Sequence, residues 1–259
     1  MREPFRSMDE ALEGLLAWER LFLDRRDRRA VFLTMYGMMT RETKRRIDAG
    51  QWADNDWVAR YLVTFADLYR RALVAYEDGN SSAVPKAWRL AFENAVAGRL
   101  LVAQDLLMGI NAHVNHDLAI ALDEVSIDPD RTIRKGDHDA VNTVLRDVAD
   151  VVQQQISVMY APGLAAVDAS LGRLDEVTAL FSLEVARENA WEAAVALANS
   201  RNGIERATVK RALDLRSALM ARVLLAPAIS PTLMSVLRKV EEGAWWKILE
   251  AARTAGIQG

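Results

Sequence analysis

Apolar residues recur every three or four positions along most of the chain, which is the spacing of helices that bury one face. No run of alternating apolar and polar residues bounded by hairpin turns interrupts this pattern. Apolar residues make up 51% of the 259 positions, so a sizeable core can be buried. The sequence therefore predicts an all-α fold, a bundle of about eight or nine helices around a central apolar helix.

Capping residues, glycines and prolines divide this pattern into segments. The first helix is expected to begin at SMDE, where Ser7 can cap the helix and Glu10 can reach back. Further helices are expected over residues 28–49, 55–77, 86–123 with a break near Gly98 or Gly109, 137–160, 174–199, 204–226 and 231–254. Because the linkers are short, residues 1–259 are predicted to form a single domain.

Composition excludes several classes of function. The 33 basic and 36 acidic residues are interleaved, which argues against a nucleic-acid partner. The chain has no cysteine, so disulfides, thiolate metal sites and cysteine nucleophiles are excluded. No apolar run reaches the roughly 18 residues of a membrane span, and the start MREPFRSMDE lacks the apolar core of a secretion signal. We expect a cytoplasmic protein that does not enter a membrane.

The segment GINAHVNHDLAIAL places two histidines, two asparagines and an aspartate in an otherwise apolar helix. At about 100° per residue, His113, His116 and Asp117 interrupt one apolar stripe. Asn111 and Asn115 lie among the apolar residues of the opposite side. Burial without partners costs about 1–3 kcal/mol for each group. These side chains must therefore bond to one another, bind a ligand or line a wet cavity.

The spacing of this cluster permits a metal site. His113 and His116 are three residues apart and can reach one ion, while Asp117 can be a third ligand or orient a histidine. Asp137, which follows a short loop, is a further candidate ligand. The expected cofactor is a divalent metal, zinc or another ion with nitrogen and oxygen ligands. A polar network that only fixes the central helix explains the same residues equally well.

The third histidine lies in KGDHDAVN, between two aspartates. The favoured interpretation is that Asp137 caps a helix and that Asp139 is an acid of its first turn. His138 stays a candidate acid or base, and Asn142 a candidate for substrate binding.

A second cluster occurs in FSLEVARENAW. Glu184 and Glu188 are four apart and are predicted to face inward, on the side that carries Trp191. Two carboxylates in an apolar setting raise each other's pKa, which suits a general acid or base. The alternative is an internal ion network, because Arg187 lies within one turn of both. Arg187 and Trp191 are candidates for substrate binding.

NAHVNHDL, the preceding YRRAL, a D-x-x-x-V-N element at 137–142 and an A-R-x-x-A-W element at 186–191 resemble an uncharacterised bacterial family of all-helical proteins, domain of unknown function 5995. The likeness covers roughly residues 28–200 and leaves a C-terminal helical extension, about 204–254, outside. It implies no established activity. The family pattern highlights Asn111, His113, Asn115, His116, Asp117, Asp137, Asn142, Arg187 and Trp191. Ala140 stands where such sequences often have an aromatic residue.

Three classes of function fit these residues. The narrowly favoured one is a metal-assisted hydrolase, perhaps a phosphoesterase, in which the histidine cluster holds the ion and Glu184 or Glu188 moves protons. The second is a metal-free cyclase or lyase of specialised metabolism, acting on an apolar small molecule in a tryptophan-lined cavity. The third is a non-catalytic helical ligand-binding or scaffold protein, in which every histidine is already paired. A homodimer is expected from the apolar C-terminal helices.

Overall fold

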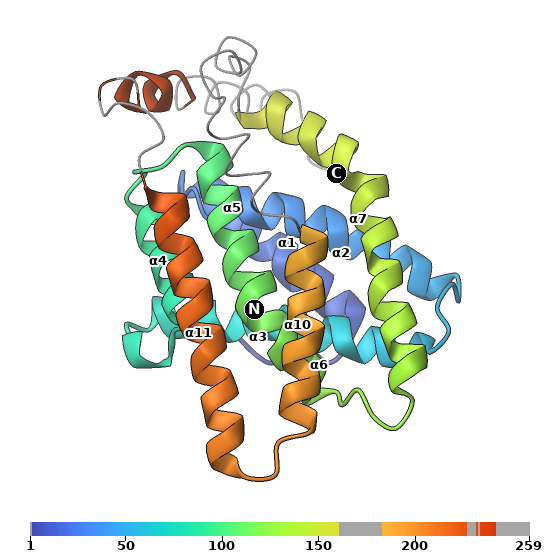
Figure 1. Cartoon of the computed structure of the whole chain (residues 1–259). Coiled ribbons are helices and arrows are strands. Elements are labelled where there is room, and N and C mark those ends of the chain that lie inside the picture. Colours follow the sequence, from blue (N-terminus) through green and yellow to red (C-terminus); the bar gives the residue numbers. More distant parts are fainter. Residues whose placement is uncertain (1, 161–182, 227–231, 233, 242–259) are drawn as a thin grey trace.

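The structure is a computed structural model that describes residues 2–160, 183–226, 232 and 234–241 (Figure 1). All regular elements in these ranges are helical, and no strand occurs among them, so the predicted all-α fold is confirmed. None of the helices described is long and apolar enough to cross a membrane. The helices are α1 (Met8–Asp24), α2 (Ala30–Asp48), α3 (Asn55–Glu77), α4 (Lys86–Val96), α5 (Val102–Ala112), α6 (Leu118–Glu124), α7 (Arg131–Tyr160), α10 (Leu183–Ala198) and α11 (Gly203–Leu225), with short turns η1 (Ser81–Ala83) and η2 (His113–Asp117).

Local sequence signals set several helix ends. The Ser7 hydroxyl accepts a hydrogen bond from the Glu10 amide at 3.1 Å, and the Glu10 carboxylate accepts one from the Arg6 amide at 2.8 Å. Gly98 has a φ of 57°, a conformation that glycine adopts without strain, and it lies between α4 and α5. The helix predicted over 86–123 therefore breaks at Gly98. Gly109 instead allows close packing, because an added Cβ would lie 2.5 Å from the Phe32 ring.

The α5–η2–α6 segment forms the centre of the bundle. It contacts α2, α3, α4, α10 and α11, and Figure 1 shows it in green between these helices. One apolar core lies mainly around α1, α2, α4 and α5, and a second lies around α3, α6, α7 and α10. The prediction of a central helix that carries the polar cluster is confirmed, and the cluster lies where the two cores meet.

Residues 234–241 are helical and are tied to the bundle by a buried ionic group. Arg28 donates from Nε to Asp105 at 2.7 Å and from Nη2 to Glu241 at 3.3 Å. The Glu241 carboxylate also accepts a hydrogen bond from the Val102 amide at 3.1 Å. Burial raises the pKa of Asp105 to about 6 and the pKa of Glu241 to about 7, against the opposing charge of Arg28. The chain after α11 thus contacts the start of α2 and α5.

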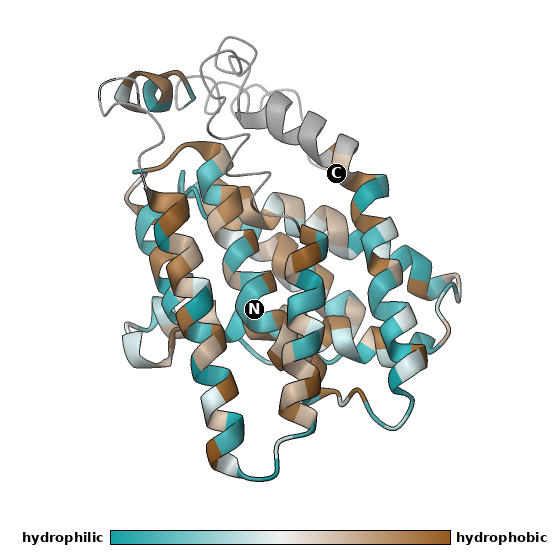
Figure 2. Ribbon diagram, in the orientation of Figure 1, coloured by the Kyte–Doolittle hydropathy of each residue, from teal (hydrophilic) through white to brown (hydrophobic). Residues whose placement is uncertain are grey.

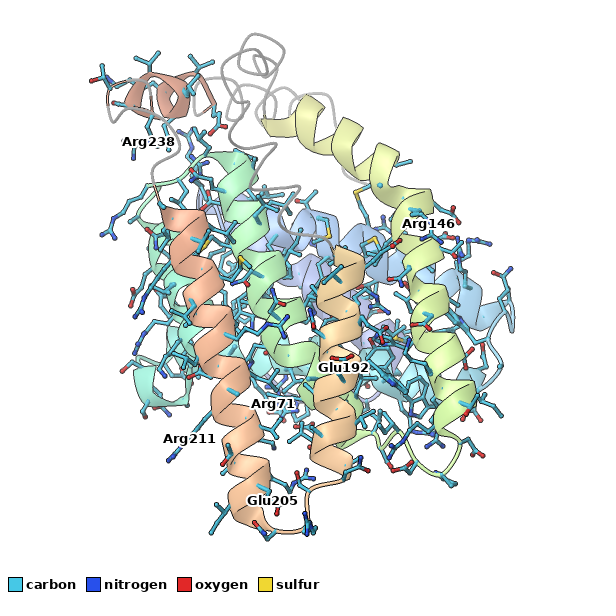
Figure 3. All side chains as sticks on the ribbon, in the orientation of Figure 1. Arg71, Arg146, Glu192, Glu205, Arg211 and Arg238 are labelled. Carbon is cyan, nitrogen blue, oxygen red and sulfur yellow. The ribbon has the colours of Figure 1, made fainter. Side chains whose placement is uncertain are left out.

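The outer helix faces carry most of the charged side chains, including Arg146, Glu192 and Arg211 (Figure 3). Along α11, apolar positions are interspersed with hydrophilic ones (Figure 2). Leu215 and Leu219 of this helix are 53% and 50% exposed. The expected homodimer stays a prediction.

Candidate functional site

The histidine cluster lies on η2, a π-helical turn in which the Leu118 amide donates to the carbonyl of His113, five residues earlier. Such turns are rare, and many occur at functional sites. The turn is wider than one of an α-helix. It brings the Asp117 carboxylate within hydrogen-bond distance of the rings of both His113 and His116.

Asp117 is the centre of a buried hydrogen-bond network and is 1% exposed. One carboxylate oxygen lies 2.7 Å from Trp88 Nε1 and 3.1 Å from His113 Nδ1, and the other lies 2.8 Å from His116 Nδ1. Burial raises the pKa of Asp117, but the hydrogen bonds with the two histidines outweigh burial and hold the pKa below its usual value. The group is therefore a carboxylate that accepts from three N–H donors, and both histidines carry their proton on Nδ1.

His113 has one paired and one unpaired ring nitrogen. Its ring stacks on Phe65 with a centroid distance of 3.5 Å, and it meets the ring of Tyr36 edge-on at 4.6 Å. Burial lowers the pKa of His113, against the effect of Asp117, so the ring is neutral at pH 7. Because Nδ1 holds the proton, Nε2 carries a lone pair. Nε2 is buried and has no hydrogen-bond partner among the described residues.

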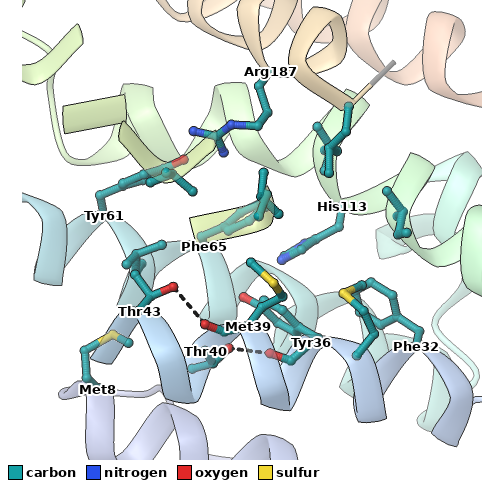
Figure 4. Close-up of a pocket in the computed structure, with 17 residues that line it drawn as sticks. Met8, Phe32, Tyr36, Met39, Thr40, Thr43, Tyr61, Phe65, His113 and Arg187 are labelled. Carbon is teal, nitrogen blue, oxygen red and sulfur yellow. Dashed lines mark hydrogen bonds between the residues drawn. The ribbon is translucent and has the colours of Figure 1, made fainter. Parts of the chain in front are cut away.

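His113 borders an apolar pocket of about 100 Å³ between α2, α3, η2, α7 and α10 (Figure 4). Methionines and aromatic rings form most of its walls. The Thr40 and Thr43 hydroxyls donate to the carbonyls of Tyr36 and Met39 at 2.7 and 2.8 Å, so their hydrogens are already used. The wall residues that the sequence analysis did not select as site residues are Met8, Phe32, Met35, Tyr36, Met39, Thr40, Thr43, Tyr61, Leu62, Phe65, Ile110, Val114, Val141, Leu145 and Leu183.

Tyr36 brings a hydroxyl to the same pocket. Burial raises its pKa well above 10, and the negative charge of Asp117 adds to this effect. The hydroxyl therefore stays protonated and can donate a hydrogen bond. Figure 4 shows Tyr36 and His113 together at the pocket, extending from different helical segments.

His138 forms a second buried histidine site, and it is fully paired. Nδ1 lies 3.5 Å from the Tyr61 hydroxyl, and Nε2 lies 3.2 Å from the carbonyl of Arg187. Because a carbonyl only accepts, Nε2 carries the proton and Nδ1 accepts from Tyr61. Burial lowers the pKa of His138 well below its usual value, and the charge of Arg187 lowers it further. This neutral ring connects α3, α7 and α10.

Arg187 is the one predicted substrate-binding residue that lines the pocket. Its Nε donates to Asn142 Oδ1 at 2.7 Å, and its Nη2 donates to the carbonyl of His138. Trp191 packs against the ring of His138 with a centroid distance of 5.3 Å. Asn142 and Trp191 thus support Arg187 and His138 from outside the pocket.

The two asparagines of the cluster connect helices. Asn111 Nδ2 donates to the carbonyl of Ser217 on α11 at 2.9 Å, and Asn115 Nδ2 donates to Asn111 Oδ1 at 3.0 Å. Neither side chain borders the pocket. These hydrogen bonds explain why two polar side chains of the cluster are buried, and no ligand is needed to explain them.

Asp137 belongs to a different network from the histidine cluster. Its carboxylate accepts from the amides of Ala53 and Asp54 at 2.8 and 2.7 Å, directly before α3. The prediction that Asp137 caps its own helix is wrong, because α7 already begins at Arg131. In the described ranges, no group of three or more histidine or acidic side chains is arranged to hold a metal ion.

The prediction that Glu184 and Glu188 face inward is wrong. Both are exposed, and they pair with Arg146 at 2.6 Å and Lys135 at 2.9 Å. The buried face of α10 consists mainly of alanines, with Arg187 and Trp191 among them. Alanine gives a weak hydrophobic signal, which explains the wrong choice of face.

Helix α2 contributes more residues to the pocket walls than any other helix, and its sequence AVFLTMYGMMT is apolar on nearly all sides. That composition, rich in methionine, is a signal of an adaptable binding surface that sequence reasoning missed. No tryptophan is among the described residues that line the pocket, and the expectation of a tryptophan-lined cavity is therefore wrong for this part of the chain. Trp88 instead binds Asp117, and Trp57 donates to the carbonyl of Ser126.

Fold and site together define an all-helical protein in which a buried aspartate holds a histidine that borders an apolar pocket. The chain belongs to the family of unknown function DUF5995, whose model matches residues 8–227. The match includes α1 and α11 and is longer than the range 28–200 of the sequence resemblance. No curated protein and no solved structure matches the chain.

Proposed function

We propose that the protein is an enzyme that moves a proton on an apolar small molecule without a metal ion, as in an isomerisation, elimination or cyclisation. The observation that supports it is His113 Nε2, a buried lone pair without a partner in the described chain, at the wall of an apolar pocket. Leaving such a group unpaired costs about 1–3 kcal/mol, so a ligand group that hydrogen-bonds there would recover this free energy.

Each residue of the site then has a role. His113 Nε2 takes a proton from a C–H group of the substrate, and Asp117 orients the ring and stabilises the imidazolium that forms. The protonated Tyr36 hydroxyl donates a hydrogen bond to the oxygen on which negative charge develops. The proton then returns to another carbon or to a leaving group. The apolar walls exclude water and keep these electrostatic effects strong.

The two other classes of function have less support. A scaffold protein needs every buried histidine to be paired, and His113 Nε2 has no partner in the described part of the chain. The metal-assisted hydrolase needs its ligands to meet, yet the Asp117 oxygens already accept from Trp88 and both histidines. Asp137 binds amides that precede α3.

Deuterium exchange tests this proposal without knowledge of the natural substrate. The parent protein is incubated in D₂O with small apolar ketones and 3-oxo acids, and C–H to C–D exchange is followed by NMR. We expect His113→Gln to lower the exchange rate by about 10² or more, the usual contribution of a general base. The double variant Glu184→Gln, Glu188→Gln changes only surface ion pairs and is the control. Equal rates in the parent and His113→Gln, or no exchange by the parent across the panel, would contradict the proposal.

A further inference from the structure

We propose that the substrate of this pocket carries a carboxylate, that Arg187 binds this carboxylate, and that the rest of the molecule is a small apolar body. The inference rests on the proposed function only in taking the pocket as the substrate site. It adds the chemical class of the ligand, which His113 and Tyr36 alone do not specify.

Arg187 has no negatively charged partner among the residues that the structure describes. Its guanidinium is buried, with 4% of the residue exposed, and the acceptors of its hydrogen bonds, Asn142 Oδ1 and the carbonyl of His138, are neutral. The Tyr61 hydroxyl beside the guanidinium is neutral as well, because burial raises its pKa. The acids of the same helix, Glu184 and Glu188, pair with other cations at the surface. A buried charge without a counter-charge is costly, and an anionic ligand removes that cost.

The position of the Arg187 guanidinium also favours the binding of a ligand. Arg187 lines the pocket from α10, and Figure 4 shows its guanidinium extending over Tyr61, apart from His113. Tyr61 is fixed by His138, and Arg187 is fixed by Asn142. The cation is therefore held in place before a ligand arrives, which reduces the entropy cost of binding.

The choice of a carboxylate follows from charge and volume. Arg187 is the only cationic side chain among the described residues of the wall, so a singly charged group is neutralised, whereas a phosphate dianion would keep an excess charge. The rest of the wall is mostly apolar, with Met35, Met39 and Phe65 among its members, and its polar side chains are uncharged. A space of about 100 Å³, bounded in part by flexible methionine side chains, suits a small apolar body.

Calorimetry with matched probes tests the inference. Phenylacetate and hexanoate are compared with phenylacetamide and hexanamide, which have nearly the same shape without the charge. We expect the parent protein to bind the acids at least about tenfold more tightly than the amides, and inorganic phosphate more weakly than the acids. Equal affinity for acids and amides, no binding of any acid, or tighter binding of phosphate would overturn the inference.

Variants of Arg187 make the test specific. Arg187→Gln is expected to lower the affinity for the acids about tenfold or more and to remove the preference over amides. Arg187→Lys keeps the charge and should keep part of the preference, which covers the case in which Arg187→Gln does not fold. Arg146→Gln removes an exposed arginine outside the pocket and should bind as the parent does. An acid preference that persists in folded Arg187→Gln would contradict the assignment.

The two proposals fail in different ways. His113→Gln should keep the acid preference, because His113 does not contact Arg187 in the structure described. Acid-selective binding without any C–H exchange would remove only the proposed reaction. Exchange on neutral ketones without any acid preference would remove only the carboxylate site.

Discussion

His113 and His138 are both buried histidines among aromatic rings, and both have a lowered pKa, yet they differ in how their nitrogens are paired. Both nitrogens of His138 have partners, the Tyr61 hydroxyl and the carbonyl of Arg187. His113 has one partner, Asp117, and its Nε2 is unpaired. Burial and a shifted pKa are therefore shared by both sites, and the unpaired nitrogen at a cavity is what separates them.

The comparison also predicts opposite tautomers. Asp117 draws the proton of His113 to Nδ1, whereas the carbonyl of Arg187 draws the proton of His138 to Nε2. His138 connects three helices and has no lone pair left for chemistry. His113 is held just as firmly and keeps one lone pair at the pocket. The first arrangement stabilises the fold, and the second suits a general base.

Removal of Asp117 should have the largest effect on stability, because it breaks the arrangement that distinguishes His113. Asp117→Ala leaves three buried N–H donors, of Trp88, His113 and His116, without their acceptor. We expect a loss of about 3 kcal/mol or more in the free energy of unfolding, measured by urea denaturation. Asp139→Ala removes a half-buried partner of Lys135 and should cost less than about 1 kcal/mol. Similar losses for the two variants would refute the network.

Matched phenylalanine substitutions compare the two histidines directly. His138→Phe removes the hydrogen-bond partner of the Tyr61 hydroxyl and the side-chain donor to the Arg187 carbonyl, for a loss of about 1–3 kcal/mol. His113→Phe should cost less, since Asp117 keeps Trp88 and His116 and the unpaired Nε2 disappears. Both losses are measured by urea denaturation at pH 7.5. A larger loss for His113→Phe would mean that Nε2 has a partner in the folded protein.

A smaller effect is expected in the pH dependence of stability. Both histidines have folded pKa values below 6.5, so acid protonates them in the unfolded chain first, and stability falls as the pH drops below about 6.5. Asp105 and Glu241 act in the opposite direction, because their folded pKa values are raised. Between pH 7.5 and 5.5, His138→Phe should lose about 1 kcal/mol less than the parent. Identical slopes in the two proteins would show that His138 titrates normally.

The sequence predicted the fold because its signals are local: helical periodicity, the Ser7 cap and the break at Gly98. It also identified His113 and Asp117, since polar residues interrupt a strongly apolar helix there. It could not show which nitrogen stays free, because this depends on the π-helical turn and on Trp88, 29 residues away from Asp117.

The other differences between the predicted and the observed site also come from contacts that are distant in the sequence or from weak local signals. Asp137 binds the amide of Ala53, 84 residues earlier, and no local pattern indicates such a contact. The methionine-rich composition of α2 suits a binding surface but also an ordinary core helix, and only the packing shows that its residues surround a space. The buried face of α10 is formed by small residues, which carry little hydrophobic contrast. Long-range contacts therefore decide where the site lies and which groups it contains.

The tautomer of His113 is the most direct test of the central claim, that Nε2 is a free base at the pocket. Protein labelled with ¹⁵N in histidine gives the protonation of each ring nitrogen by NMR at pH 7, with resonances assigned through His113→Gln and His138→Gln. We predict a neutral His113 with its proton on Nδ1 and a neutral His138 with its proton on Nε2. Addition of phenylacetate should shift the ring-nitrogen resonances of His113 and leave those of His138 unchanged. A His113 ring that is charged, or protonated on Nε2, would contradict the account.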